Sequence, residues 1–279
     1  MKIGKTVKWM FLFAISNLSA QNNYSIDFGI NAQPTENIKS NEVSLEIDYS
    51  KTFDTKVRIA NEFKFNSKKI NYFNYDFSNS LTEYYKIRNK FALTYLKSEK
   101  LNFNFEIEPF IASEYNLNVA DIDLLGGLSI DFILSPKKEI RLGLSRNTSL
   151  GKPKILPVFS YYYAYNKEFS FSIGFPETNI KYSNNPRNSF YIKNSFTGDV
   201  YNLENTFKSF SLNSTKSSFS QQTTSLEYER NMDANWFVNF KVGYDFNRKY
   251  LLQDSNYNTT FDFNIKDGCN FGITIKYKH

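Results

Sequence analysis

The sequence of 279 residues contains one cysteine, Cys269, and one histidine, His279. A single cysteine excludes an internal disulfide framework and a four-cysteine zinc site. Since the histidine stands at the end of the sequence, Ser-His and Asp-His mechanisms have no partner within the folded domain. HExxH, CxxC, GxGxxG and P-loop motifs are missing as well. We therefore expect a protein that is not an enzyme and that uses no metal ion or cofactor.

Long apolar runs and an excess of basic charge are also missing. After residue 20 no run of about 18 or more apolar residues occurs, which excludes a transmembrane helix. Three of the 34 basic residues lie in the first eight positions, so 31 basic residues stand against 28 acidic ones in the rest. This small surplus argues against a nucleic-acid partner.

The first twenty residues have the layout of an export signal. Lys2, Lys5 and Lys8 precede the apolar run 9–15, and Asn-Leu-Ser-Ala at 17–20 is a plausible cleavage site. The alternative, an ordinary N-terminal helix, is disfavoured because the run is short and its flank is basic. We expect a signal peptide over 1–20 and a mature domain over 21–279, located in the periplasm or the outer membrane.

Aromatic residues are abundant, at 18% of the sequence, although the mean hydropathy is −0.49. Apolar and polar residues alternate, as the stretch 101–111 illustrates. Its apolar parity holds Leu101, Phe103, Phe105, Ile107 and Ile111, and its polar parity holds Asn102, Asn104, Glu106 and Glu108. Strict alternation of this kind predicts a β-strand with one apolar and one polar face.

Fourteen segments show this alternation, and short connections between them alternate with longer ones. That layout is typical of an outer-membrane barrel, in which the short turns face the periplasm. We predict an all-β, antiparallel, up-and-down transmembrane β-barrel of about 14 strands. Twelve strands are the alternative, if the weak segment 200–212 is a loop and one other weak segment drops out. The predicted strands are 24–30, 41–50, 55–65, 84–96, 101–111, 122–134, 139–145, 155–165, 168–175, 188–195, 200–212, 223–230, 235–246 and 269–279.

The number of strands decides which face looks inward. Side chains can fill a closed barrel of about eight strands, whereas fourteen enclose a wider space. We therefore expect the apolar parity to face lipid and the polar parity to line a wet lumen. Aromatic residues near strand ends are expected to form two girdles at the membrane interfaces: Tyr84, Tyr85, Tyr95, Phe110, Tyr161, Tyr162, Tyr163, Tyr165, Tyr244 and Tyr277.

The last segment carries Phe271, Ile273, Ile275, Tyr277 and His279 on one parity. It resembles the terminal strand of outer-membrane proteins, which usually ends on an aromatic ring. The resemblance implies recognition by the barrel-assembly machinery, although a histidine occupies the final ring position here.

A more specific resemblance covers residues 174–203. It consists of Gly174-Phe175-Pro176, Ile180, Tyr182, Pro186-Arg187, Phe190-Tyr191, Gly198, Tyr201 and Leu203. The segment resembles an uncharacterised Bacteroidetes-type family of outer-membrane β-barrels, a domain of unknown function. This resemblance implies the location and the fold and brings no activity or catalytic residues with it.

Charged residues on the polar parity are the candidate functional residues. We expect the lumen to be lined by Lys86, Arg88, Lys90, Glu106, Glu108, Asp123, Asp131 and Arg141. A register that pairs Leu96 with Asn102 sets Lys90 opposite Glu108. Such charges either form a transverse field that selects solutes or simply pair with each other along the wall.

We predict an outer-membrane barrel that passes or binds small polar solutes or has a structural surface role, with outer-membrane lipid as its surroundings. The polar and aromatic stretch 71–80 is a mobile loop, a glycan-binding loop or a plug in the barrel mouth. A soluble periplasmic β-sandwich or lipocalin-like binder is the alternative. A hydrolase that uses carboxylates such as Glu106 or Asp123 is a third, weaker hypothesis.

Overall fold

The computed structural model describes residues 23–279 except 54, 74–80 and 205–213. The predicted export signal lies outside these residues and stays a prediction. No helix in the described part of the chain is long and apolar enough to cross a membrane. The elements are β1 (Asn23–Gln33), β2 (Ile38–Phe53), β3 (Val57–Tyr72), β4 (Leu81–Ser98), β5 (Leu101–Glu114), η1 (Val119–Asp121), β6 (Ile122–Ser135), β7 (Lys138–Asn147), β8 (Lys154–Ala164), β9 (Phe169–Phe175), β10 (Glu177–Asn185), β11 (Asn188–Asn202), β12 (Lys216–Asn231), β13 (Trp236–Gln253), β14 (Thr259–Asp262) and β15 (Gly268–Lys278).

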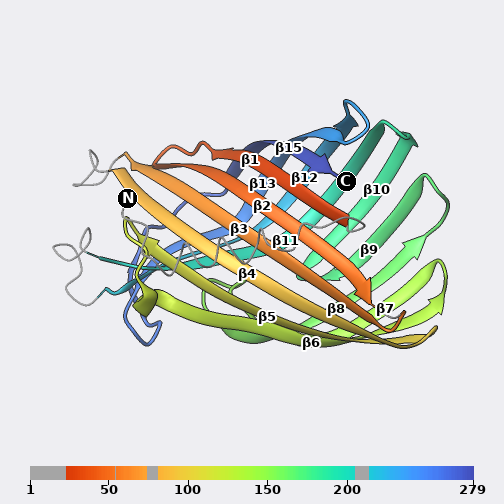
Figure 1. Ribbon diagram of the computed structural model, residues 1–279. Coiled ribbons are helices and arrows are strands. Elements are labelled where there is room, and N and C mark those ends of the chain that lie inside the picture. Colours follow the sequence, from red (N-terminus) through yellow and green to blue (C-terminus); the bar gives the residue numbers. More distant parts are fainter. Residues whose placement is uncertain (1–22, 54, 74–80, 205–213) are drawn as a thin grey trace.

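The strands form one closed antiparallel barrel (Figure 1). Each strand from β1 to β13 pairs with the next one, and β15 closes the ring between β13 and β1. The short strand β14 pairs only with β13 and stands outside the ring. Fourteen strands therefore make the wall, which confirms the predicted fold class and strand number.

The two ends of the barrel differ in the lengths of their connections. The connections after even-numbered strands span two to four residues, from 99–100 to 165–168, and we call their side the turn end. The first described residue, Asn23, and His279 lie there too, since Asn23 pairs with Ser50 near the end of β2 and the backbone amide of His279 donates to the Tyr24 carbonyl at 3.0 Å. The connections 115–121 and 254–267 lie at the opposite end, which we call the loop end and which also has the short connections 34–37 and 176.

The second half of the chain corrects the strand assignment. Residues 176–187, predicted as a long loop, contain β10, and Pro176 alone connects it to β9. The turn expected at 196–199 lies inside β11. The weak segment 200–212 is not a separate strand, because residues 200–202 end β11 and residues 205–213 lie outside the described chain. The predicted number of fourteen strands was still right, because β10 replaces the segment 200–212 in the count.

Apolar side chains cover the outer surface of the wall. Leu128 on β6 is 65% exposed and Ile155 on β8 is 71% exposed. Exposed apolar residues come from every wall strand, among them Ile26, Phe28, Ile30, Val43, Ile59, Phe91, Leu93, Phe103, Phe105, Leu142, Leu144, Phe159, Ile173, Tyr182, Phe190, Ile192, Leu226, Phe240, Val242, Phe271, Ile273 and Ile275. A belt of this size exceeds the patches that soluble monomers expose.

The loop end of the barrel is filled by side chains. A buried cluster there joins residues of β2 to β6 with residues of β11 to β13 and of the following connection. Two predicted girdle residues, Tyr84 and Phe110, belong to this cluster and lie inside the barrel, so their assignment to the membrane interface was wrong. The cluster contains Ile38, Ile70, Tyr72, Tyr84, Phe110, Ala112, Leu125, Tyr201, Tyr250, Leu252 and Phe263. We call it the plug.

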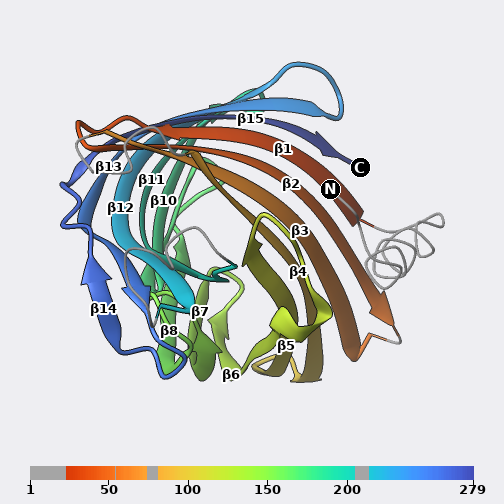
Figure 2. The same ribbon diagram turned by 90° about the vertical axis from the view of Figure 1, so that its left-hand side faces the viewer.

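The plug forms because the barrel narrows. Beyond Ile111, which pairs with Ile122 at the start of β6, the edge of β5 is free, and Asn202 of β11 pairs with Ser113 there. Figure 2 shows the end of β11 inside the ring of strands. At this level β1 and β15 have ended, so seven strands, β2 to β5 and β11 to β13, surround the plug together with the 254–267 connection. Side chains can fill a ring of about this size, whereas they cannot fill fourteen strands.

A β-bulge in β13 turns further side chains toward the plug. The pairing of β12 with β13 shifts register between Ser220 and Gln222, and Asn247 on the opposite strand has a φ of 51°. Such a bulge reverses the face on which later side chains lie. Up to Phe246 the even-numbered residues of β13 face outward, whereas Tyr250 and Leu252 are fully buried in the plug.

Candidate solute site in the barrel lumen

A polar cavity of about 590 Å³ lies in the lumen next to the plug. Its lining comes from strands all around the ring, since the polar parity of each strand faces inward. Charged residues dominate the lining on the side of β2 to β5: Glu42, Glu46, Lys64, Lys68, Lys86, Arg88, Lys90, Glu106 and Glu108.

Ion pairs connect these charges from strand to strand. Arg88 bridges Glu62 on β3 and Glu108 on β5, the latter at 3.4 Å. Lys90 contacts Glu62 at 3.1 Å, and Lys64 contacts Glu46 at 2.7 Å. Since all of these side chains are partly solvated, each pair stabilises the fold by little, about 1 kcal/mol or less. Their main effect is to hold the long side chains against the wall.

Five of the eight predicted lumen residues line this cavity: Lys86, Arg88, Lys90, Glu106 and Glu108. Leu96 pairs with Asn102, and the register between Phe91–Ile107 and Arg88–Phe110 puts Lys90 opposite Glu108. The ion pairs nevertheless do not join these directly opposed residues, because Lys90 contacts Glu62 and Glu108 contacts Arg88. Long side chains reach diagonal neighbours as easily as direct ones.

The other three predicted residues lie on the same inner parity but outside the cavity lining. Asp131 of β6 accepts two hydrogen bonds from Arg141 of β7, at 2.6 and 3.1 Å. Asp123 lies near the loop end, 3.2 Å from Arg146. These residues pair with each other and with the wall and do not belong to the lining of the 590 Å³ cavity.

Sequence reasoning missed the charges on the opposite wall. Lys193 pairs with Glu227 at 3.0 Å, and Lys276 contacts Asp27 at 3.6 Å and Glu229 at 3.4 Å. The alternation rule that selected β4 and β5 applies equally to β11, β12 and β15, so the signal was available. With acids and bases interleaved on both walls, no wall of the described lumen carries a single sign of charge.

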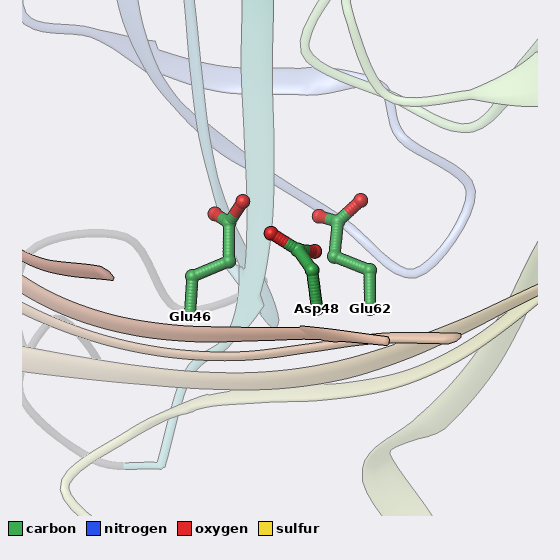
Figure 3. Close-up of side chains that lie close together, drawn as sticks. All are labelled: Glu46, Asp48 and Glu62. Carbon is green, nitrogen blue, oxygen red and sulfur yellow. The ribbon is translucent and has the colours of Figure 1, made fainter. Parts of the chain in front are cut away.

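Three carboxylates approach each other on β2 and β3 (Figure 3). One oxygen from each of Glu46, Asp48 and Glu62 lies within 4.8 Å of the others. Lys64 already pairs with Glu46, Arg88 and Lys90 pair with Glu62, and Ser25 donates to Asp48 at 3.0 Å. The neighbouring cations offset much of this charge, so the cluster belongs to the ion-pair network of the wall.

A second cavity of about 420 Å³ lies at the turn end. It is lined by Tyr24, Asp48, Lys278 and His279, and it shares Lys90 and Glu106 with the first cavity. The polar lumen therefore continues from the plug to the turn end.

Comparisons with known proteins place the chain in a family. A family model described as Domain of unknown function (DUF6268) matches residues 19–278. None of the curated proteins matches the sequence.

Several solved structures share the barrel architecture. A mutant of the monoaromatic hydrocarbon channel TodX aligns with 95% of this chain and 93% of its own, at 10% identity and a TM-score of 0.49. The toluene transporter TbuX of Ralstonia pickettii aligns with 94% and 90%, at 8% identity and 0.49. The KdgM porin in complex with disordered oligogalacturonate aligns with 91% and 98%, at 10% identity and 0.38. At this level of similarity nothing about their substrates is transferred to the chain.

Proposed function

Because the chain belongs to the family Domain of unknown function (DUF6268), which brings no known activity, we propose its function from the geometry of the barrel. The protein is an outer-membrane barrel that admits small polar solutes to a wet lumen, and it has no catalytic role. One observation carries this proposal: the apolar parity faces outward around the whole ring while the polar parity surrounds the cavity.

The outward apolar belt supports a place in a bilayer. Closed barrels satisfy every backbone hydrogen bond within the wall, which the hydrocarbon requires. A soluble sandwich or lipocalin-like binder would bury its apolar parity, whereas Phe103 and Phe105 of β5 lie exposed on the outer surface. The partners that follow are outer-membrane lipid and, through β15, the barrel-assembly machinery.

The location is tested by fractionation of the expressing cell. We expect detergent to be needed for extraction and an unboiled sample to migrate differently from a boiled one on a gel, because a folded barrel resists unfolding. Release of the protein by osmotic shock, without detergent, would overturn the proposed location.

The lining indicates which solutes fit. Acids and bases alternate on both walls, so neither anions nor cations are favoured over the whole length of the lumen. A cavity of about 590 Å³ has the volume of a small-molecule site. We propose uncharged or zwitterionic polar solutes, which hydrogen-bond to the wall without displacing its ion pairs.

Conductance in planar lipid bilayers tests passage through the lumen. Within the described residues, Glu106 on β5 and Lys241 on β13 line the cavity without an ion pair. Their strands lie well apart in the ring of fourteen, six steps in one direction and eight in the other. We expect Glu106→Gln to shift the reversal potential in a salt gradient toward anion selectivity and Lys241→Gln to shift it toward cation selectivity. Folded protein without any conductance in either variant would contradict passage.

A further inference from the structure

The loop-end half of β11 leaves its neighbour β10 and crosses the lumen together with the end of β12, which stays paired with β13 as far as Gln253. β10 pairs with β11 only as far as Glu177 with Ser195, and the Pro176 carbonyl accepts from the Phe196 amide, so residues 197–201 have no strand partner on that side. They approach β5, where Asn202 pairs with Ser113, while β11 and β12 stay paired as far as Asn202 with Lys216. The crossing segment, residues 196–202 and 216–220, is called the hairpin below.

One carboxylate ties the hairpin to the opposite wall. Asp199 lies 2.8 Å from the ammonium group of Lys86 on β4 and 3.6 Å from that of Lys68 on β3. Lys68 also contacts Glu42 on β2 at 3.3 Å. Charge-assisted contacts of this kind are short and depend on geometry, so they form only while the hairpin is across the lumen.

Hydrogen-bonded tyrosines lie next to this ion pair in the plug. The hydroxyl of Tyr250 lies 2.5 Å from that of Tyr72 and 2.9 Å from that of Tyr84. From the hairpin, Tyr201 packs on Tyr84 at 4.8 Å between ring centroids, and Phe219 stacks on Tyr250 at 4.3 Å. A core with polar groups at its contact surface separates at less cost than a purely aliphatic one, because water can replace its hydrogen bonds.

The hairpin also has a place to bend. The register shift between Ser220 and Gln222, opposite Asn247, stands at the point where β12 passes from the wall into the hairpin. The connection 148–153 between β7 and β8 also contacts the hairpin through polar groups. Thr148 donates a hydrogen bond to the Gly198 carbonyl at 2.7 Å, and Ser218 donates one to the Gly151 carbonyl. A bulge at the base and polar contacts on both faces are what a movable segment requires.

We propose that the hairpin is a gate for the polar lumen and that the structure shows its closed state. In the open state residues 196–202 part from β5, Asp199 leaves Lys68 and Lys86, and the cavity connects with the loop end. This inference rests on the proposed passage of polar solutes and assigns its control to one segment of the wall.

A reversible crosslink tests the gate in conductance measurements. In the Cys269→Ser background, Ser113→Cys with Asn202→Cys joins the hairpin to β5 at their paired position. Asn41→Cys with Lys69→Cys is the matched control, because it joins two strands that stay paired in either state. We expect oxidation to abolish openings of the first variant, a reductant to restore them, and the control to conduct equally in both conditions.

Chemical labelling tests the movement without any need for conductance. Ser217 of the hairpin is fully buried, so Ser217→Cys in the Cys269→Ser background is accessible to a membrane-impermeant maleimide only when the gate opens. We expect Asp199→Asn to speed this labelling about tenfold or more, since it removes the charge that holds the hairpin. We expect the crosslink to Ser113 to stop it. Gel mobility of unboiled samples identifies variants that have not folded. The crosslinked variant and Ser217→Cys both keep Asp199, so they test the movement with the ion pair of the native chain in place.

The outcomes separate the gate from the passage. Labelling that the crosslink stops, together with zero conductance in every variant, would leave the gate standing and overturn the proposed passage. Conductance that is the same with the crosslink oxidised or reduced would overturn the gate and leave the passage standing. A Ser217→Cys variant that is never labelled in folded protein would likewise overturn the gate.

Discussion

A charged substitution at Leu128, on the lipid-facing side of the wall, should lower the free energy of unfolding by an amount that the structure lets us estimate. This residue is the seventh of the fourteen in β6 and is 65% exposed. Fourteen residues at about 3.3 Å each, tilted by about 40°, rise about 35 Å along the barrel axis, compared with an apolar band of about 25 Å. Leu128 therefore lies near the middle of the bilayer.

An arginine at this position has no partner on the outer surface. Leu128 pairs with Phe105 on β5 and with Leu144 on β7, both apolar and outward-facing. We expect Leu128→Arg to lower the free energy of unfolding by about 2–4 kcal/mol, the cost of a cation at the bilayer midplane. On the surface of a soluble protein the same change would stay within about 0.5 kcal/mol.

The neighbouring position provides the control. Ser129 lies on the opposite parity and accepts a hydrogen bond from Asn104 on the polar face. We expect Ser129→Arg to cost about 1 kcal/mol or less, because water solvates the new charge. Denaturant titrations of protein folded in lipid vesicles, followed by the fluorescence of Trp236, compare the two variants. Equal effects of Leu128→Arg and Ser129→Arg would refute the assignment of the faces.

Three further predictions concern the loop end. A Cβ atom at Gly198 would lie 2.2 Å from the Thr148 carbonyl oxygen, so we expect Gly198→Ala to cost about 1–3 kcal/mol and to speed proteolysis of loop 148–153; unchanged stability and proteolysis would contradict this close contact. Tyr250→Phe removes the hydroxyl shared by two buried tyrosines and should cost about 1–3 kcal/mol in the same titration, and a neutral effect would mean that those hydroxyls find other partners. Hydrogen bonds from the Asn258 side chain and backbone lower the pKa of Asp254 in the 254–267 connection. Since this pKa is depressed, the ionised Asp254 carboxylate stabilises the ordered connection at pH values above the ordinary pKa of aspartate. This stabilisation is lost as the pH falls through the pKa of Asp254 in the folded protein. An NMR titration should show the low pKa and its rise in Asn258→Ala, and an ordinary pKa in the unmodified chain would contradict these contacts.

The alternation of residue types was enough to predict most of the wall. In β5 and β6 the parity of Phe103, Phe105 and Leu128 alone assigns the outer face, because successive side chains of a strand point to opposite faces. β10 escaped this reasoning. Its sequence ETNIKYSNN holds only two large apolar residues, Ile180 and Tyr182, and Pro176 before it suggested the start of a loop. Pro176 fits a tight connection because its carbonyl accepts from the Phe196 amide and it lacks a donor of its own.

The plug was beyond the reach of local patterns. It depends on the pairing of Asn202 with Ser113, which lie far apart in the sequence, and on a bulge at Asn247 that reverses the parity of β13. One signal was present nonetheless. Tyr84 and Phe110 share their parity with Lys86 and Glu108, so the alternation already placed these two rings inside the barrel.

The accessibility of spin labels along β5 tests directly which side of each strand meets lipid. Single labels at positions 102 to 107, in the Cys269→Ser background in lipid vesicles, are exposed in turn to oxygen and to a water-soluble nickel complex. We predict that collisions with oxygen dominate at 103, 105 and 107 and that collisions with nickel dominate at 102, 104 and 106. The opposite phase, or no alternation at all, would contradict an apolar exterior around a polar lumen.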